Sequence, residues 1–355
     1  MSEKMKALVM YAPYDFRYED VAIPEIGPEE ILVKIEACGI CAGDVKTYHE
    51  NVRVWGTCDE DRYIEPPVIG GHEFVGRVCK LGSGVQGHKI GERLVAEQIA
   101  PCGECRFCKA GDYNMCSRAY IYGFKQDAQG GMAEYMRYRG DSLLHVIPEN
   151  MSVEQAALIE PMACGMHCAE RGKIQHRDVV VVSGLGTIGQ CIISVAKRKY
   201  QARTVIGLDL REKRLDKALE CGADYVFNPT KCDVVGEIRK LTGGDGCDVY
   251  IESAGSQASV KQGFEAIRNR GRFVEMGVFP KPITADFNYI GDGKEIDIYG
   301  SHLSPDCYEP VIQGMLDGSI VTNGLVSHTY RLADWKAGFE TAEKDPDAFK
   351  VILIP

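Results

Sequence analysis

Short runs of alternating polar and apolar residues fill the first part of this chain, up to about residue 150. Such runs occur at 6–10, 31–35 and 74–78, and Gly and Pro separate them. Alternation with a period of two is typical of half-buried strands, and Gly and Pro favour the turns that connect strands. This stretch therefore predicts a compact domain rich in β-strands.

From about residue 155 the pattern changes to strands that alternate with helices. The continuous apolar run 179–182 predicts a buried strand, and apolar residues at helical spacing follow over 187–199. The same pattern predicts further strands and helices at 204–208, 213–220, 248–251 and 271–275. This alternation indicates a parallel sheet with helices on both faces, an α/β arrangement. The tail from about residue 295 returns to shorter, irregular elements.

The length of 355 residues predicts two domains. The hydrophobic fraction of 45% indicates a globular chain. The net charge is −10 and basic residues form no block, which argues against binding to nucleic acid or to an anionic membrane. The N-terminus lacks the apolar region of a signal peptide, and no stretch approaches the length of a membrane helix. With 15 cysteines and no export signal, the chain is expected in the reducing cytoplasm.

Four cysteines stand close together in the pattern C-x2-C-x2-C-x7-C, at Cys102, Cys105, Cys108 and Cys116. Four thiolates at this spacing can enclose one divalent metal, and a tetrahedron of sulfur ligands selects zinc. A site closed by four protein ligands leaves no position for substrate, so the pattern predicts a structural zinc. The alternatives are unrelated or disulfide-bonded cysteines and an iron–sulfur cluster, although clusters favour other spacings.

A glycine-rich turn follows the first predicted strand of the second region. Gly184, Gly186 and Gly189 form a G-x-G-x-x-G motif that opens a helix, and Asp209 ends the next strand. This context is typical of dinucleotide binding, because the helix N-terminus attracts the pyrophosphate and the acidic residue accepts the ribose hydroxyls. The alternative is a turn without a ligand. The predicted cofactor-binding residues are Gly184, Gly186, Ile188, Gly189, Asp209 and Arg214.

The charge of Asp209 predicts NAD rather than NADP, because a carboxylate repels a 2′-phosphate. Arg211 and Arg214 follow in the sequence and could offset that repulsion.

Three separated segments offer further metal ligands: Cys38 to Asp44, His72 with Glu73, and Glu160 before Pro161. No argument from the residues alone brings these segments together in space. The stretch Gly71-His72-Glu73-x2-Gly76-x5-Gly82-x2-Val85 resembles the zinc-containing signature of the medium-chain alcohol dehydrogenase family. The cysteine-rich stretch and the glycine motif stand in the order of that family, and the resemblance covers essentially the whole chain.

The resemblance implies the family's fold, with a GroES-like catalytic domain and a Rossmann domain that binds NAD. The catalytic domain is expected at 1–155 and 295–355, with a structural zinc lobe at about 98–118, and the Rossmann domain at 156–294. The resemblance also implies a homo-oligomer, a dimer or a tetramer, and two zinc ions per chain.

By the same resemblance, Cys41 and His72 are expected to bind a catalytic zinc, with Glu73 or Glu160 as the third ligand. Asp44 is expected to orient the histidine. Gly43 departs from the family, which commonly places a Ser or Thr there to relay the alcohol proton. A water, Glu160 or Lys46 would have to replace that hydroxyl.

The pair Glu160-Pro161 resembles the sorbitol and threonine dehydrogenase branch of the family, and this implies a secondary alcohol of a small polyol as substrate. The stretches 48–56, 58–61 and 120–125 resemble erythritol/threitol dehydrogenases. The alternatives are oxidation of threonine or of sorbitol or another sugar alcohol, and a catalytically inactive relative that binds NAD. Trp55, Tyr122 and Phe124 are candidates for pocket walls or for ordinary core positions, and His49 and His167 are weaker ligand candidates.

Overall fold

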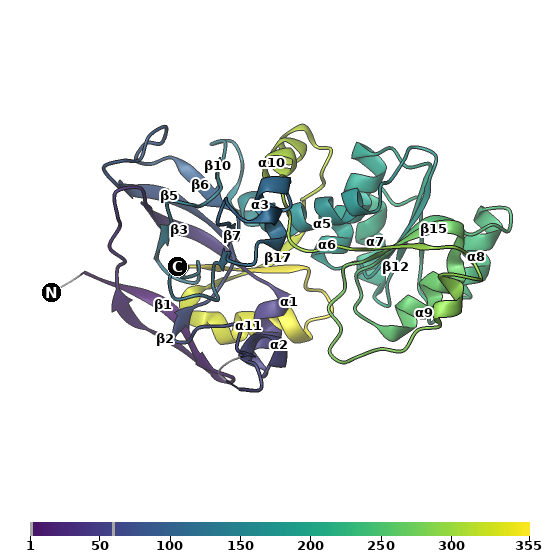
Figure 1. The fold of residues 1–355 in the computed structure, drawn as a ribbon, viewed down its shortest axis with the longest axis horizontal. Helices are drawn as coiled ribbons and strands as arrows, with labels where there is room; N and C mark the ends of the chain where they lie inside the picture. The colour runs from purple at the N-terminus through teal and green to yellow at the C-terminus, as the bar shows by residue number, and fades with distance from the viewer. Residues whose placement is uncertain (1–2, 59–60) are drawn as a thin grey trace. The chain divides into compact units, whose positions relative to one another are not determined.

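The computed structural model describes residues 3–58 and 61–355, so the middle of the acidic stretch 58–61 lies outside the described residues. The chain divides into two units (Figure 1). Unit 1 comprises Met1–Glu160 and Thr322–Pro355, and unit 2 comprises Pro161–Val321. The second boundary lies later in the chain than the position 294/295 expected from the sequence.

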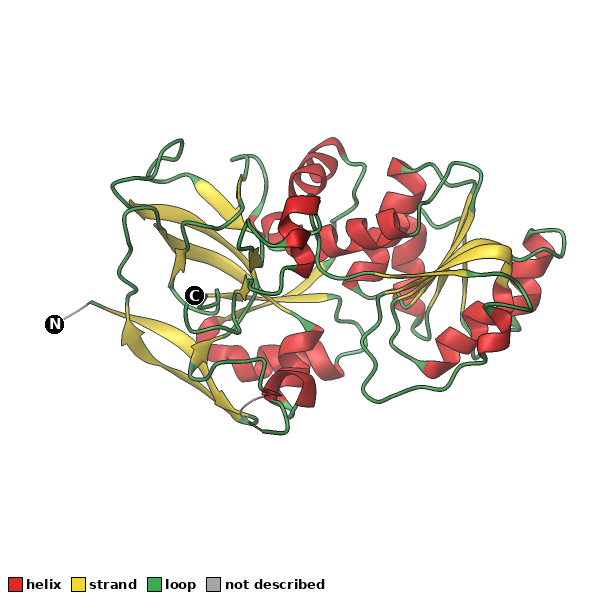
Figure 2. Cartoon of the chain, in the orientation of Figure 1, coloured by secondary structure: helices red, strands yellow, loops and turns green. Residues whose placement is uncertain are grey.

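Unit 1 is built mainly from strands, as the alternating pattern predicts (Figure 2). Its main sheet has the order β10-β6-β5-β3-β18-β17, with β9 also paired to β3, and smaller sheets have the orders β2-β1-β4 and β7-β8. The strands are β1 (Lys4–Ala12), β2 (Asp15–Ala22), β3 (Ile31–Ile40), β4 (Val68–Ile69), β5 (Glu73–Leu81), β6 (Arg93–Ala96), β7 (Ile99–Ala100), β8 (Tyr120–Ile121), β9 (Tyr135–Tyr138), β10 (Leu144–Val146), β17 (Val326–Arg331) and β18 (Lys350–Ile354).

The helical elements of unit 1 are short. They are α1 (Ala42–Tyr48), α2 (Val52–Trp55), α3 (Arg106–Ala110), η2 (Tyr113–Met115), α4 (Val153–Ala156), η5 (Leu332–Asp334) and α11 (Trp335–Lys344). Helix α5 (Ile159–Arg171) begins with the last residues of the first segment of unit 1. The central strand β3 is buried along most of its length, and its apolar side chains form the core with β5, β6, β9 and α11.

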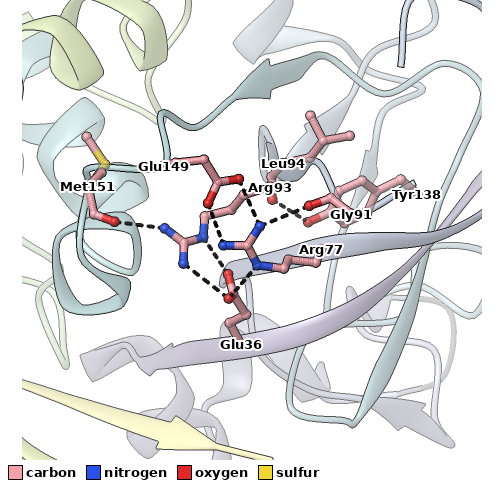
Figure 3. A network of polar contacts seen from close by, with 8 residues as sticks. All are labelled: Glu36, Arg77, Gly91, Arg93, Leu94, Tyr138, Glu149 and Met151. Carbon is pink, nitrogen blue, oxygen red and sulfur yellow. Dashed lines mark hydrogen bonds and ion pairs between the residues drawn. The ribbon is translucent and has the colours of Figure 1, made fainter. Parts of the chain in front are cut away.

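A network of charged groups links three strands of the main sheet (Figure 3). Glu36 on β3 accepts hydrogen bonds from Arg77 on β5 and from the buried Arg93 on β6. Arg93 also donates to the carbonyl of Met151 at 2.7 Å, and Arg77 binds both oxygens of Glu149 at 2.9 Å. Burying a guanidinium is costly unless it is paired. Here both guanidinium groups are paired, and their shared partner Glu36 links β3 to β5 and to β6.

Unit 2 contains the predicted parallel sheet, with helices on both of its faces (Figure 2). The strand order is β13-β12-β11-β14-β15-β16, and every pair in this sheet is parallel. From β11 the chain first adds β12 and β13 on one side of β11, and then adds β14, β15 and β16 on its other side. The strand order therefore reverses between β11 and β14. Ligands of such sheets bind outside the carboxyl ends of the strands at this reversal.

The elements of unit 2 are β11 (Val179–Ser183), α6 (Thr187–Ser194), η3 (Val195–Lys199), β12 (Thr204–Leu208), α7 (Glu212–Cys221), β13 (Tyr225–Phe227), α8 (Val234–Leu241), β14 (Cys247–Glu252), α9 (Gln257–Ala266), β15 (Ile267–Glu275), η4 (Phe287–Tyr289), β16 (Asp297–Gly300) and α10 (Tyr308–Asp317). The helix expected over 187–199 changes at Val195 into a π-helical turn. There Tyr200 N–H donates to the carbonyl of Val195, five residues back.

The tail after residue 295 is more regular than the sequence pattern predicts. Strand β16 adds a further parallel strand to the sheet of unit 2, and α10 follows it. Strand β18 then pairs antiparallel with β3 and parallel with β17. Because β18 is buried beside β3, the end of the chain belongs to the main sheet of unit 1.

Candidate active site and metal centres

Cys41, His72 and Glu73 come together where two neighbouring strands of unit 1 meet. Cys41 directly follows β3, and His72 directly precedes β5. The two strands pair so that Gly39 lies opposite Glu73. One metal-ligating atom from each of the three residues lies within 4.8 Å of the other two. The register of one antiparallel pair thus brings together donors that the sequence separates.

Cys41 is the N-cap of α1, and its side chain is held by backbone contacts. Its sulfur accepts a hydrogen bond from Gly43 N–H at 3.4 Å, and its own N–H donates to Asp44 Oδ2 at 2.9 Å. The reciprocal contacts form a capping box, which fixes the direction of both side chains. Asp44 is buried, and its Oδ1 lies 3.6 Å from Nδ1 of His72.

His72 is buried among negatively charged groups. Burial alone would lower the pKa of this histidine. The charges of Asp44, Cys41 and Glu160 outweigh burial and raise the pKa of His72 well above its usual value. Within the described part of the chain, Nδ1 of this ring has no hydrogen-bond partner. A buried imidazole next to a thiol and carboxylates is a donor set that fits a divalent cation, zinc above all.

Glu73 is paired with Lys350, a residue that the sequence did not single out. Nζ of Lys350 lies 2.6 Å from both carboxylate oxygens of Glu73 and donates to the carbonyl of Ile40 at 3.2 Å. Both side chains are buried, Glu73 at 2% exposure and Lys350 at 4%. Gly39 leaves the space for this carboxylate, because a Cβ there would lie 2.0 Å from Glu73 Oε2.

Glu160 lies near this group but outside the set of mutually close donors. It is the second residue of α5, is 5% exposed, and accepts a short hydrogen bond from Nε2 of Gln98, which is equally buried. Burial lowers the pKa of both His72 and Lys350, but the charge of Glu160 adds to the neighbouring negative groups that raise it. Glu160 therefore faces the same anionic pocket as the other candidates.

Other candidates from the sequence are placed in different surroundings. His49 is partly exposed, and its ring lies 3.2 Å from Glu343. His167 lies in unit 2, beside Glu170. Trp55 and Tyr122 are buried in the core, whereas the ring of Phe124 packs against His72 at 5.7 Å between ring centroids. Of the three aromatic residues, Phe124 is the one that contacts a candidate ligand.

The four-cysteine lobe, residues 102–116, brings its sulfur atoms together as the spacing predicts. The four Sγ atoms lie within 4.8 Å of one another. Cys105 N–H donates to the sulfur of Cys102 at 3.4 Å, and Cys108 N–H donates to that of Cys105 at 3.5 Å. All fifteen cysteines of the chain are free thiols, so the disulfide alternative does not fit this arrangement.

The thiols of the lobe differ in how readily they lose their protons. The backbone N–H of Glu104 lowers the pKa of Cys102 to about 6, and that of Cys108 lowers the pKa of Cys105. Burial and the neighbouring Cys105 sulfur raise the pKa of Cys108 to about 12. These opposite shifts describe a cluster whose mutual repulsion one divalent metal would remove.

The glycine motif of unit 2 has the geometry that the sequence predicts. Gly184 has a φ of +94°, and a Cβ there would lie 2.6 Å from the backbone nitrogen of Ala254. A Cβ on Gly189 would lie 2.0 Å from the carbonyl oxygen of Gly184. Gly186 is the N-cap of α6, and Ile188, two residues further in the first turn of that helix, is half-buried. Glycine alone therefore fits at positions 184 and 189.

Asp209 lies at the carboxyl end of β12, beside the glycine turn. Its Oδ2 accepts from Leu185 N–H at 2.8 Å, and its Oδ1 accepts from Arg211 N–H at 3.0 Å. Nη1 of Arg214 lies 3.7 Å from Oδ2. The structure thus joins the predicted acidic residue to the turn through a direct hydrogen bond.

Comparison with known proteins agrees with these features. Residues 27–149 match the model of the alcohol dehydrogenase GroES-like domain, and residues 187–317 match that of the zinc-binding dehydrogenases. The erythritol/L-threitol dehydrogenase of Mycolicibacterium smegmatis is 42% identical over 356 residues, which is 99% of this chain and 98% of that protein. The chain belongs to the zinc-binding alcohol dehydrogenase family.

Two further members of the family illustrate the range of the match. The sorbitol dehydrogenase of Halalkalibacterium halodurans is 34% identical and covers 99% of both chains. The crystal structure of a zinc-binding dehydrogenase from Sinorhizobium meliloti, bound to NADP, superposes with a TM-score of 0.90 at 29% identity over the full length of both chains.

The predicted fold class, a GroES-like domain with a Rossmann domain, is confirmed by these matches. The chain is accordingly a dehydrogenase, and its relatives include polyol dehydrogenases. Across the residues that the structure describes, helices long and apolar enough to span a membrane do not occur.

Proposed function

We propose that this dehydrogenase oxidises a secondary alcohol of a small polyol, of the erythritol or threitol kind, to a ketose with NAD as hydride acceptor. The observation that carries the proposal is the anionic pocket formed by Cys41, His72 and the carboxylates Glu73 and Glu160. Bound zinc supplies a Lewis acid for the alcohol oxygen, and bound NAD accepts the hydride.

Cys41 and His72 would hold the catalytic zinc, and Glu160 is the proposed third donor. Both oxygens of Glu73 face the ammonium group of Lys350, which already neutralises that carboxylate. Glu160, by contrast, accepts a hydrogen bond from the neutral amide of Gln98, and its negative charge acts on the neighbouring His72, as expected of a donor that shares a cation with that ring. Zinc content decides between the two carboxylates: Glu160→Gln is expected to weaken zinc binding more than Glu73→Gln.

The four-cysteine lobe would hold a second, structural zinc. All its donors are sulfur atoms from one short stretch, and backbone N–H groups already donate to three of them, Cys102, Cys105 and Cys116. The proposed stoichiometry of two zinc ions per chain is tested by metal analysis of the purified protein.

NAD is the proposed cofactor because Asp209 places a carboxylate beside the glycine turn, where a 2′-phosphate would meet repulsion. Asp209→Ala is expected to reduce the preference for NAD over NADP by about tenfold or more. Asp317→Ala, an exposed substitution in the same unit, is the control. If the ratio of kcat/KM for NAD to kcat/KM for NADP is unchanged in Asp209→Ala, this residue does not bind the adenine ribose.

The polyol specificity rests on the likeness to the erythritol/L-threitol dehydrogenase, and sorbitol and threonine are the alternative substrates. Initial rates of NAD reduction on erythritol, threitol, sorbitol and threonine separate these possibilities when metal content is measured on the same sample. Rates highest on the four-carbon polyols are expected. Turnover of threonine alone would contradict the proposal, because that substrate needs partners for its ammonium and carboxylate groups.

We also propose that the protein is a homo-oligomer, a dimer or a tetramer. Strand β16 forms one edge of the sheet in unit 2, with Ile298 exposed there. An unpaired edge with an apolar side chain is suited to pairing with a second chain. The molar mass in solution, measured by light scattering, tests this proposal.

A further inference from the structure

The segment between β6 and β7 carries two buried polar side chains that reach two different parts of unit 1. Glu97 is 3% exposed and contacts the four-cysteine lobe, and Gln98 is 5% exposed and contacts Glu160. Burying polar groups next to each other is costly unless both are hydrogen-bonded. Both are bonded here, so the two contacts hold one short piece of backbone between the lobe and the candidate active site.

Tyr113 makes the contact from the lobe. It lies between Cys108 and Cys116, and its hydroxyl lies 3.1 and 3.0 Å from the two oxygens of Glu97. Nε2 of His145 on β10 lies 3.2 Å from the same carboxylate. Hydrogen bonds to a charged acceptor are stronger than neutral ones. Glu97 therefore fastens the lobe to the main sheet.

The lobe also closes the hairpin that holds Gln98. Strands β7 and β8 pair antiparallel, with Ala100 opposite Tyr120, and residues 101–119 connect them through the lobe. At the other end of the hairpin, Tyr122 N–H donates to the carbonyl of Gln98 at 2.9 Å. The position of the Gln98 backbone thus depends on a hairpin whose tip is the four-cysteine lobe.

The side chain of Gln98 completes the connection. Its amide donates to Oε1 of Glu160, and both residues are 5% exposed. A buried amide that donates to a ligating carboxylate fixes which way that carboxylate points.

We propose that Gln98 is a positioning residue for Glu160, and that the four-cysteine lobe keeps Gln98 in place through the β7–β8 hairpin and the Tyr113–Glu97 contact. The lobe, in this view, sets the geometry of the catalytic metal site as well as the stability of its own loop. The inference rests on the proposed function, because it requires Glu160 to be a donor to the catalytic zinc.

Gln98→Leu tests the first step, because leucine is similar in size and removes the amide donor. The affinity of the catalytic site for zinc is measured by competition with a chromophoric chelator, in protein that retains its second zinc. Removal of a residue that orients a metal ligand typically costs about 10–100-fold in metal affinity, and a decrease in this range is expected. The absorption spectrum of Co²⁺ in the catalytic site should shift as well, because the ligand geometry changes.

Tyr113→Phe tests the second step without touching the candidate active site. It removes the hydroxyl that binds Glu97 and leaves every cysteine in place. A smaller decrease in affinity at the catalytic site, with the same shift of the Co²⁺ spectrum, is expected. Tyr138→Phe is the matched control, because it removes a hydroxyl that donates to the carbonyl of Leu94 and keeps the ring that packs against Tyr122.

Glu160→Gln separates this inference from the proposed function. If Glu160→Gln weakens zinc binding and Gln98→Leu changes neither the affinity nor the Co²⁺ spectrum, the inference is wrong and the proposed function stands. If Glu160→Gln leaves zinc binding unchanged, both the proposed third donor and the inference are overturned. If Tyr113→Phe behaves like Tyr138→Phe while Gln98→Leu weakens binding, the part assigned to the lobe is wrong.

Discussion

The two candidate metal centres of unit 1 are built in opposite ways. The four-cysteine lobe takes all its donors from one short stretch of chain, and its backbone N–H groups point at the sulfurs. The pocket of Cys41, His72, Glu73 and Glu160 takes its donors from the ends of β3 and β5 and the start of α5. One centre is encoded locally, and the other exists only once the sheet has formed.

The two centres also differ in how their negative charge is balanced. In the pocket, Lys350 on β18 pairs with Glu73 and so supplies a cation from the protein itself. In the lobe, Arg118 reaches the sulfur of Cys102 at 3.5 Å, but it is mostly exposed and also pairs with Glu104. The lobe therefore depends on its metal for charge balance more than the pocket does.

This difference predicts that the two metals leave separately, and it gives the largest expected effect. Mild chelation should remove the zinc of the pocket first, because that site is open and includes an oxygen donor, and activity should be lost completely. The fold should survive, because Lys350 remains in the pocket and the lobe keeps its metal. Zinc content, activity and circular dichroism are followed together during chelation. Loss of both metals and of the fold in a single step would contradict the comparison.

The buried pair Lys350–Glu73 gives the next largest effect. Lys350→Met leaves the carboxylate of Glu73 buried without its partner, which typically costs about 3–5 kcal/mol of stability. The double substitution Lys350→Met with Glu73→Gln should recover much of that loss, because no unpaired charge remains. Lys344→Met, which breaks an exposed pair with Glu340, is the control and should change stability far less, because water screens an exposed pair. Denaturation by urea gives the free energies of unfolding.

The pH dependence of this pair follows from the raised pKa of Lys350. Burial acts against the charged form, but Glu73 and Cys41 outweigh it and raise the pKa above its usual value. A group whose pKa is raised on folding contributes its full stability below the unfolded pKa and loses it as the pH rises through the folded value. The pair should therefore stabilise the protein at neutral pH, and its contribution should disappear only in strongly alkaline solution. An equal effect of Lys350→Met at neutral and strongly alkaline pH would be inconsistent with an ion pair.

The same contrast explains what could be predicted from the sequence. The lobe and the glycine turn are local patterns, so spacing alone predicts that their residues meet. The meeting of Cys41 with His72 needed the resemblance to a family, because it depends on the register of β3 against β5. Lys350 and Gln98 were missed altogether. Their partners lie 277 and 62 positions away in the sequence. A lone lysine at the start of an apolar strand belongs to no pattern that predicts its partner.

The smallest expected effect concerns Gly43, beside Cys41 in the pocket. Among the residues that the structure describes, the sulfur of Cys41 is the neighbour that a Cβ at this position would meet, at an ordinary contact distance of 3.6 Å, so serine fits there. We expect that a water beside Gly43 carries the proton of the alcohol in the parent protein.

Gly43→Ser should then change the pH dependence of kcat/KM more than the maximal rate, because it alters the path of the proton and leaves the hydride acceptor unchanged. Glu160→Gln provides the comparison. If Glu160 itself accepts the proton, Gly43→Ser should leave the pH profile as it is, whereas Glu160→Gln should shift the profile and lower the rate by about 10²–10⁴-fold, the usual contribution of general acid–base catalysis. Because Glu160→Gln is also expected to weaken zinc binding, both profiles must be recorded at saturating zinc. If neither substitution changes the pH profile of kcat/KM, the proton leaves by a route that involves neither residue. The pocket would then bind the metal without taking part in proton transfer.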